Sequence, residues 1–423
     1  MPNGSESVSG NNDGPTEADS SADTQVEHRT SVPAEAVADG DVTRVALRSE
    51  LPPLRSVHTD SFPRLLEQLG ISLLVTTYQV GKLVVLRSDG GVLNTHFRQF
   101  GKPMGLAVQG DRLAIGTALE IWEYHNVPAA AGRLEPAGWH DACFLPHSSL
   151  RTGDIQIHEM AWGRAGHHLP GSSPSDEPEL WFVNTRFSCL CTRDRIHSFV
   201  PRWKPPFVSA LVPEDRCHLN GLCLVDGRPA FVTAFGDTDT PEGWRADKKS
   251  GGILIEVQTG EILVRGLSMP HSPRWHAGKL WVLESGTGSM GYIDPVTRQY
   301  QRIAEFPGFT RGLDFVGNLA FVGLSQVRES AVFSGISIAD RPLSERCSGV
   351  WVLNITTGQT VAYVKFEEAL QEIFAVQVLP GMRFPDVIND DARVLADSFV
   401  IPEPSLKLAP GNPRANQDAS PPT

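Results

Sequence analysis

The hydrophobic and polar positions of this chain repeat one pattern: an apolar strand, a glycine-containing turn and a second apolar strand that ends near Ser, Thr or Asn. The clearest example is 220–234 (NGLCLVDGRPAFVTA), whose two apolar runs meet at Asp226-Gly227. An Asp-Gly pair between apolar runs is typical of a β-hairpin turn. Copies of the pattern lie at 104–125, 158–185, 220–234, 272–285, 311–325 and, in part, 373–381.

The runs between these copies predict hairpins of their own. They cover 251–267, 290–308 and 349–366, with turns expected at Thr259-Gly260, Asp294-Pro295 and Thr357-Gly358. A spacing of roughly 40 to 60 residues, filled by four short antiparallel strands, is typical of a propeller blade. Six copies therefore predict an all-β fold, a β-propeller with six four-stranded blades.

The propeller is predicted to span 51–401, with N-terminal strands completing a blade with the C-terminal one. Such closure removes exposed sheet edges. Helical spacing is sparse: 61–70 (SFPRLLEQLG) predicts a short helix that stops at Gly70, and 367–372 is a second candidate. No long amphipathic pattern alternates with the strands, which excludes an α/β fold.

The two ends of the sequence differ in composition from the middle. Residues 1–50 are acidic and rich in Ser, Asp, Glu, Gly and Asn, and the tail 402–423 is similar. Both are predicted to be disordered, because they cannot bury enough apolar surface to offset the entropy of ordering. The formal net charge of -12 argues against nucleic-acid binding and against attraction to an anionic membrane.

The sequence has no secretory signal at its start and no apolar run near the ~20 residues of a membrane span. Six cysteines in 423 residues do not suggest a disulfide framework. We therefore expect a cytoplasmic protein with free, mostly buried thiols, and neither a nucleic acid nor a membrane as partner.

The residues that precede each inner strand are candidates for a functional site, because these positions lie at the mouth of a propeller's central channel. Aligned on their apolar runs, five copies place in one slot Met104, His158, Asn220, His271 and Arg311. The tripeptide Gln371-Glu372-Ile373 precedes the sixth copy. Polar groups that recur in such a slot would converge on the channel axis.

Imidazoles and carboxylates near this slot are ligand types of zinc, iron, manganese and copper. The metal ligands predicted from the sequence are His158, His218, His271 and Glu159, with Glu372 as a further carboxylate. A divalent metal bound there could polarise a carbonyl or activate water.

Without a metal, His158 or His271 could act as a general base, and Arg311 could hold a carboxylate or phosphate. In an enzyme of this kind, hydrolysis or oxidation is the expected reaction, although the sequence does not decide whether the protein is an enzyme. The catalytic candidates are His158, His271 and Glu159, and the binding candidates are His218, Asn220, Arg311 and Glu372.

Several long strings carry a resemblance to one family, among them 152–163 (TGDIQIHEMAWG), 198–222, 250–288 and 306–325 (FPGFTRGLDFVGNLAFVGLS). Over nearly all of 60–390 the chain resembles an uncharacterised, propeller-like family of bacterial conserved hypothetical proteins, labelled as a domain of unknown function. The resemblance implies membership but brings no activity. Where that family would be expected to have His-Asp, this chain has His158-Glu159. The longer carboxylate would change the geometry of a bound metal, or would mean that the site is not a strict metal site.

Two functions are left open. The first is binding of a small molecule or peptide at the channel mouth, with or without a divalent metal. The second is a non-catalytic interaction scaffold, in which the rim binds a protein and the axial polar residues are structural. The resemblance implies a tetratricopeptide-repeat protein as partner, since family members are sometimes fused to or found beside such proteins.

Overall fold

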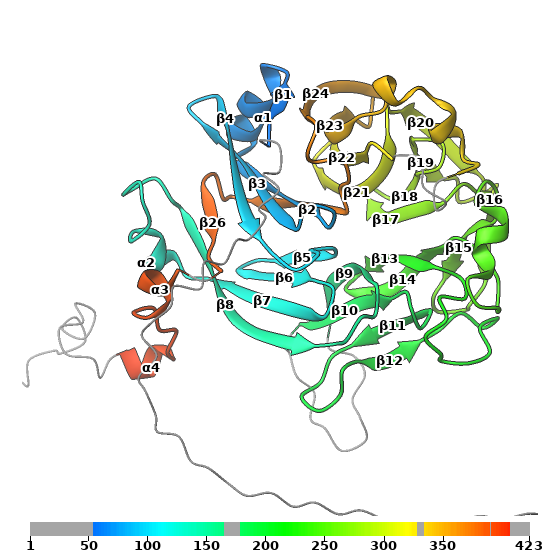
Figure 1. The fold of residues 1–423 in the computed structure, drawn as a ribbon, viewed down its shortest axis with the longest axis horizontal. Coiled ribbons are helices and arrows are strands. Elements are labelled where there is room, and N and C mark those ends of the chain that lie inside the picture. Colours follow the sequence, from blue (N-terminus) through cyan, green and yellow to red (C-terminus); the bar gives the residue numbers. More distant parts are fainter. Residues whose placement is uncertain (1–53, 165–177, 328–333, 390, 407–423) are drawn as a thin grey trace, which may run out of the picture. The chain divides into compact units, whose positions relative to one another are not determined.

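The computed structural model describes residues 54–164, 178–327, 334–389 and 391–406. These residues form six β-sheets arranged around a common centre (Figure 1). The predicted all-β, six-bladed propeller is therefore confirmed. The predicted disorder of 1–50, and of most of 402–423, concerns residues outside the described ranges.

Three successive blades each use four strands in chain order, from the innermost to the outermost. They consist of β9 (Ile157–Gly163), β10 (Glu179–Asn184), β11 (Cys189–Thr192) and β12 (Val200–Trp203); of β13 (Leu219–Val225), β14 (Arg228–Ala234), β15 (Gly252–Glu256) and β16 (Ile262–Leu267); and of β17 (Pro270–His276), β18 (Lys279–Glu284), β19 (Ser289–Ile293) and β20 (Tyr300–Glu305). The repeated copies supply the two inner strands of each blade, as predicted.

Two further blades carry a fifth strand at the outer edge. They consist of β5 (Leu106–Gln109), β6 (Arg112–Gly116), β7 (Glu120–Asn126) and β8 (Ala142–Arg151) with β26 (Pro385–Val387), and of β21 (Phe309–Val316), β22 (Leu319–Ser325), β23 (Ser348–Asn354) and β24 (Gln359–Phe366) with β1 (Ser56–His58). β26 pairs with β8 in parallel, whereas β1 pairs with β24 antiparallel. The outer edges of both four-stranded units are thus covered by other parts of the chain.

The sixth blade closes the ring. Its innermost strand, β25 (Ala375–Pro380), comes from the C-terminal part and pairs antiparallel with β2 (Ile71–Thr77), which is followed by β3 (Lys82–Asp89) and β4 (Val92–Gln99). This is the closure predicted from the sequence. Each innermost strand also packs against that of the next blade, in the order β5, β9, β13, β17, β21, β25 and back to β5.

Helices are short. α1 (Ser61–Leu69) ends at Gly70, whose left-handed φ of 64° stops it as predicted. The other helices in the described ranges are α2 (Pro128–Ala131), α3 (Ala392–Leu395), α4 (Glu403–Leu406) and the 3-10 turns η1 (Gly243–Asp247), η2 (Ser337–Asp340) and η3 (Leu343–Glu345). Throughout these ranges, every helix is too short or too polar to cross a membrane.

The helix predicted at 367–372 is wrong. A turn lies there instead, and Glu368 within it has a left-handed φ of 46°. Backbone atoms of Gln371 bond to Gln326 and to the side chain of Gln79. Contacts with two neighbouring blades therefore replace the local hydrogen bonds of a helix.

The core lies between adjacent blades. Leu74 of β2, Leu113 of β6 and Phe182 of β10 belong to one cluster and are fully buried. All six cysteines are free and five of them are buried, as predicted. Burial raises the pKa of Cys217 and of Cys223 to about 12, so both are neutral thiols.

Candidate functional site

A cavity of about 560 Å³ opens where the six inner strands begin. Its walls follow the six-fold repeat, because each blade contributes one residue to each of two rings. The mouth ring consists of Lys102, Gln156, His218, Met269, Phe309 and Glu372. The inner ring, two residues further along each strand, consists of Met104, His158, Asn220, His271, Arg311 and Phe374.

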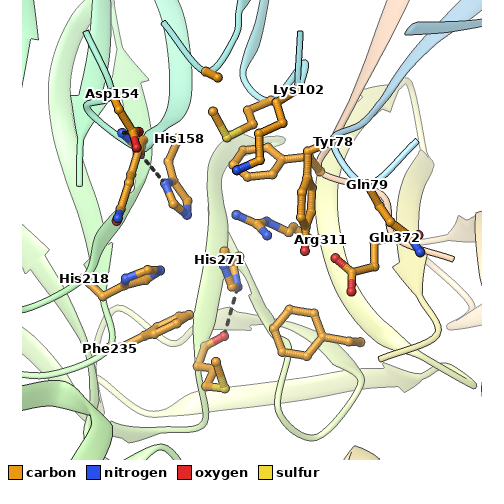
Figure 2. A pocket seen from close by; sticks show the side chains of 16 residues that line it. Tyr78, Gln79, Lys102, Asp154, His158, His218, Phe235, His271, Arg311 and Glu372 are labelled. Atoms are coloured by element: carbon orange, nitrogen blue, oxygen red, sulfur yellow. Dashed lines mark hydrogen bonds between the residues drawn. The ribbon is translucent and has the colours of Figure 1, made fainter. Parts of the chain in front are cut away.

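The structure therefore brings together residues that lie far apart in the sequence. The side chains of His158, His218, His271 and Arg311 point into the same space (Figure 2). The alignment of the copies had given five inner-ring residues, and in the sixth blade it stopped at Ile373, one residue before Phe374. Glu372 consequently belongs to the mouth ring.

Four mouth-ring residues have a left-handed backbone that is uncommon for residues other than glycine. Their φ angles are 58° at Lys102, 50° at Gln156, 50° at His218 and 46° at Met269. In two blades the carbonyl of this residue accepts a hydrogen bond from the imidazole two positions later: Gln156 from His158 and Met269 from His271. At Gln156 and Met269, the strained backbone therefore holds a carbonyl that orients the imidazole of the inner ring.

The position of the proton on His158 follows from its partners. Nδ1 lies 2.8 Å from the carbonyl oxygen of Gln156 and 2.7 Å from Oγ1 of Thr185. The Thr185 hydroxyl donates to the carbonyl of Leu219 at 2.6 Å, so it can only accept from the imidazole. Nδ1 of His158 therefore carries the proton, and Nε2 presents a lone pair to the cavity.

His271 has the same arrangement of hydrogen bonds as His158, and it lies in the blade that follows the blade of Asn220. Its Nδ1 donates to the carbonyl of Met269 at 3.1 Å and to Oγ of Ser285 at 2.8 Å. The Ser285 hydroxyl donates to the carbonyl of Thr310 at 2.5 Å. Nε2 of His271 is consequently a second lone-pair acceptor in the cavity wall.

Both imidazoles are neutral at neutral pH. Burial lowers the pKa of His158 and of His271 well below the ordinary value, and the nearby charge of Arg311 acts in the same direction. Their role as acceptors is therefore set by hydrogen bonding and by electrostatics together.

Arg311 is the principal charge of the inner ring. Its guanidinium lies over the ring of Phe374, 3.6 Å from the centroid, and hydrogen-bonds to none of the residues that the structure describes. Burial lowers its pKa to about 9, while the carboxylate of Glu159 acts in the opposite direction. The group is still charged at neutral pH, and that charge lacks a direct partner.

Glu159 does not supply that partner, because it forms an ion pair with Arg274 of β17. Glu159 lines a small hollow beside His158 and Arg311, and its ion pair connects β9 with β17. The structural reading of the axial polar residues therefore fits Glu159 well. Its predicted roles as a metal ligand or catalytic group stay predictions, and would use a carboxylate whose Oε1 is already paired with Arg274.

Asn220 also lies below the cavity and is 2% exposed. Its Oδ1 accepts a hydrogen bond from Oγ1 of Thr233 at 2.7 Å, but its Nδ2 has no partner within the described ranges. Asn220 lines a hollow of about 10 Å³ together with His158, His271 and Arg311. Nδ2 of Asn220, a donor without a partner in the described ranges, therefore lies beside the same hollow as the imidazoles of His158 and His271.

The third imidazole, that of His218, is held by a carboxylate. Nδ1 of His218 lies 2.8 Å from Oδ2 of Asp215, and Nε1 of Trp244 donates to the same oxygen at 3.1 Å. The ring stacks on Phe235 with 4.4 Å between centroids. From the sequence, Trp244 was expected in a loop near the channel mouth where it could cover a ligand, but its contact with Asp215 was not. Asp215 was given no role, although its three-residue spacing from His218 was a usable signal.

The apolar walls were also missed. Tyr78, Phe235, Phe309 and Phe374 line the cavity, but aromatic residues beside strands resemble ordinary core residues in a sequence. Figure 2 shows Tyr78 on the same side of the cavity as Glu372, away from the three imidazoles. The cavity thus has a polar floor and a partly aromatic wall.

The predicted metal site stays a prediction. The rings of His158 and His218 are 5.1 Å apart between centroids, yet within the described residues no group of three or more His, Cys, Asp or Glu side chains is placed to hold a metal ion. The charge of Arg311 beside the imidazoles would also oppose a cation.

Fold and site together define a six-bladed β-propeller with a polar cavity at the mouth of its central channel. The chain belongs to the family described as Domain of unknown function (DUF4915), whose model matches residues 60–388. The family resemblance seen in the sequence is thereby confirmed, while an association with tetratricopeptide-repeat proteins stays an expectation.

No curated protein matches the chain. Similar solved structures include a chain of the nidogen/laminin complex, with 11% identity, 74% of this chain and 99% of that chain covered, and a TM-score of 0.44. A protein of unknown function from Bacteroides caccae has 9% identity, 73% and 98% coverage and a TM-score of 0.44. Virginiamycin B lyase from Staphylococcus aureus has 10% identity, 69% and 75% coverage and a TM-score of 0.34.

Proposed function

We propose that this protein binds a small organic anion, with a carboxylate or phosphate group, at the mouth of its central channel. The observation that carries the proposal is the guanidinium of Arg311, which is charged, faces the cavity and has no hydrogen-bond partner among the described residues. A guanidinium presents a planar set of donors that fits a carboxylate or phosphate with two parallel hydrogen bonds.

The surroundings of Arg311 support this ligand class. Lys102 adds a second cation at the mouth ring, where the carboxylates of Asp154 and Glu372 also line the cavity. Apolar surface for the rest of the molecule is offered by Phe235, Phe309 and Phe374. A cavity of about 560 Å³ lies within the usual range for small-molecule sites, about 300–1,000 Å³. The positive charges of Arg311 and Lys102 attract an anion, whereas a divalent metal ion at the imidazoles would lie beside the fixed positive charge of Arg311.

The test is binding of defined anions, measured by isothermal titration calorimetry on the full chain. Benzoate, phenylacetate, citrate and phenyl phosphate are suitable probes. We expect at least one to bind the unmodified protein and to lose about 10–100-fold in affinity in Arg311→Met, because a charged hydrogen-bonded group is removed. Arg298→Met is the matched control, since Arg298 forms an exposed ion pair with Glu261, and both residues lie in turns that lead into outer strands.

If none of these anions binds, or if Arg311→Met binds them as well as the unmodified protein does, the proposal is overturned. The scaffold alternative predicts that Arg311→Met has no effect on capture of a protein partner, including a tetratricopeptide-repeat protein. Hydrolysis or oxidation of a bound ligand stays a prediction, which the same samples test when ligand concentration is followed over time.

A further inference from the structure

We infer that the anion bound at this site is a hydroxy acid, with a hydroxyl group next to its charged group that enters the hollow below Arg311. This inference rests on the proposed function and adds the chemical class of the ligand. It is carried by three groups around the hollow whose hydrogen-bonding polarity the protein fixes: two imidazole acceptors and one unused amide donor. The carboxylate of Glu159, which is paired with Arg274, also lines the hollow.

The acceptors are the Nε2 atoms of His158 and His271. Thr185 and Ser285 commit their own protons to backbone carbonyls, and so they hold the imidazole protons on Nδ1. The low pKa of both imidazoles supports the same state. A ligand group that meets these two atoms must therefore donate a hydrogen bond, which a carboxylate or phosphate dianion cannot do.

The donor is Nδ2 of Asn220. Its side chain is 2% exposed, its Oδ1 is occupied by Thr233, and Nδ2 has no partner in the part of the chain that the structure describes. A buried amide without a partner costs about 1–3 kcal/mol. A ligand group that meets Asn220 must therefore also accept a hydrogen bond.

A hydroxyl group meets a requirement of each kind: its one proton is donated to Nε2 of either His158 or His271, and its lone pairs accept from Nδ2 of Asn220. The size of the hollow selects the same group. Its volume of about 10 Å³ corresponds to about one water-sized group. The oxygen of a hydroxyl fits there, whereas a second carboxylate does not.

The position of Arg311 places this hydroxyl beside the anionic group. Arg311 lines both the hollow and the larger cavity above it. A carboxylate on the guanidinium therefore lies at the border between the cavity and the hollow, so that a hydroxyl next to it can enter the hollow. The aromatic wall above, with Phe309 and Phe374, would contact the apolar remainder of the ligand.

The test compares acids that differ by one hydroxyl. Mandelate and phenylacetate share a carboxylate and a phenyl ring, and glycolate and acetate form a second pair without the ring. Calorimetry on the full chain is expected to show the hydroxylated member of a pair binding at least about tenfold more tightly, because a site built for a hydroxyl leaves polar groups unpaired without it.

Variants of the hollow separate this inference from the proposed function. Asn220→Leu removes the unused donor at similar size without adding a charge beside Arg311, and His271→Phe removes one acceptor at similar ring size. Both are expected to bring the mandelate-to-phenylacetate affinity ratio close to one while binding still depends on Arg311. Thermal unfolding of each variant confirms that it is folded, and Arg298→Met again serves as the control that keeps the ratio.

The outcomes are distinct. Equal affinity for both members of each pair, with binding that is lost in Arg311→Met, overturns the hydroxyl inference and leaves the proposed function standing. A preference for mandelate that persists in both Asn220→Leu and His271→Phe also overturns it. Absence of binding for all four acids overturns the hydroxyl inference, and it overturns the proposed function as well when benzoate, citrate and phenyl phosphate also fail to bind.

Discussion

Arg311 illustrates how a single residue can favour binding at the expense of stability. Its guanidinium sits where burial disfavours the charged form, and Phe374 offers a ring face rather than a hydrogen bond. A charge in such a position is costly until a ligand supplies the opposite charge. Functional sites commonly retain residues of this kind.

We therefore predict that Arg311→Met is more stable than the unmodified protein in the absence of ligand, by about 1–2 kcal/mol, because the uncompensated charge is removed. Urea unfolding in ligand-free buffer measures the difference. Arg274→Met provides the contrast: it leaves Glu159 buried without its partner and is expected to cost about 3–5 kcal/mol. A loss of stability in Arg311→Met would contradict this account.

The hydroxyl groups behind the imidazoles give a second prediction at this scale. Ser285→Ala leaves the carbonyl of Thr310 without its donor and removes one acceptor of His271. The free energy of unfolding is expected to fall by about 1–3 kcal/mol. Ser285→Thr is expected to retain most of the stability, since Thr185 occupies the equivalent position beside His158. Thermal unfolding of the two variants is the measurement, and equal losses in both would argue against the hydrogen-bond explanation.

Whether a site residue could be predicted from the sequence depended on the repeated strand pattern. His158, His271 and Arg311 were found because a polar residue recurred at one place in an apolar pattern. Phe374 was missed because the sixth copy lacks such a residue, which left its register undefined. The contact of Asp215 with His218 depends on left-handed backbone at both residues, which residue types alone do not specify.

Among the elements, the inner strands depend on glycines that follow the inner ring. A Cβ atom on Gly105 would overlap the carbonyl oxygen of His158 in the next blade, and one on Gly221 would overlap Thr233 and Pro273. These positions are therefore glycine because adjacent inner strands approach closely, not because of turn geometry. The same approach brings the inner-ring side chains together.

Gly105→Ala is accordingly predicted to destabilise the protein by about 3 kcal/mol or more, since backbone atoms of two blades must move apart. Gly101→Ala is the matched control. Gly101 precedes the same strand, and a Cβ there meets nothing within 4 Å, so a change below about 0.5 kcal/mol is expected. Denaturant unfolding of both variants is the measurement. Similar losses of unfolding free energy in the two variants would refute the explanation by close approach of the strands.

The elements themselves were predictable where two signals agreed. At 220–234 the apolar alternation and the Asp226-Gly227 turn both indicated a hairpin, and β13 and β14 form it. At 367–372 the local sequence favoured a helix, but contacts with two blades determined the conformation. The three-residue strands β1 and β26 were not predicted, because so short a run has no periodicity.

At the scale of the whole molecule, Asp386 connects the segment that follows β25 to two blades. It lies in β26, which pairs with β8, while its carboxylate accepts hydrogen bonds from Arg98 of β4 at 3.2 and 2.7 Å. Burial acts to raise the pKa of Asp386, but His96 and Arg98 outweigh burial and hold that pKa well below its ordinary value. Two blades are thus joined through one ionised side chain.

This gives a prediction for acid stability. A lowered pKa in the folded state means that the unfolded chain binds the proton first, near its ordinary value of about 3.9. The stabilisation by Asp386, about 2–3 kcal/mol, is therefore complete above about pH 5 and declines as the pH falls below about 4. Unfolding free energies of the unmodified protein and Asp386→Asn, measured from acidic to neutral pH, should converge at low pH. A constant difference would contradict the role of the ionised carboxylate.

Ring closure has a consequence for synthesis. Strand β2 leaves the ribosome roughly 300 residues before its partner β25, which at about 5–20 residues per second is a delay on the order of 15–60 s. During that time the apolar edge of β2 can pair with strands of other nascent chains. A chaperone that shields this edge would raise the yield of native protein, and the blade whose strands are translated first would be the last to be completed.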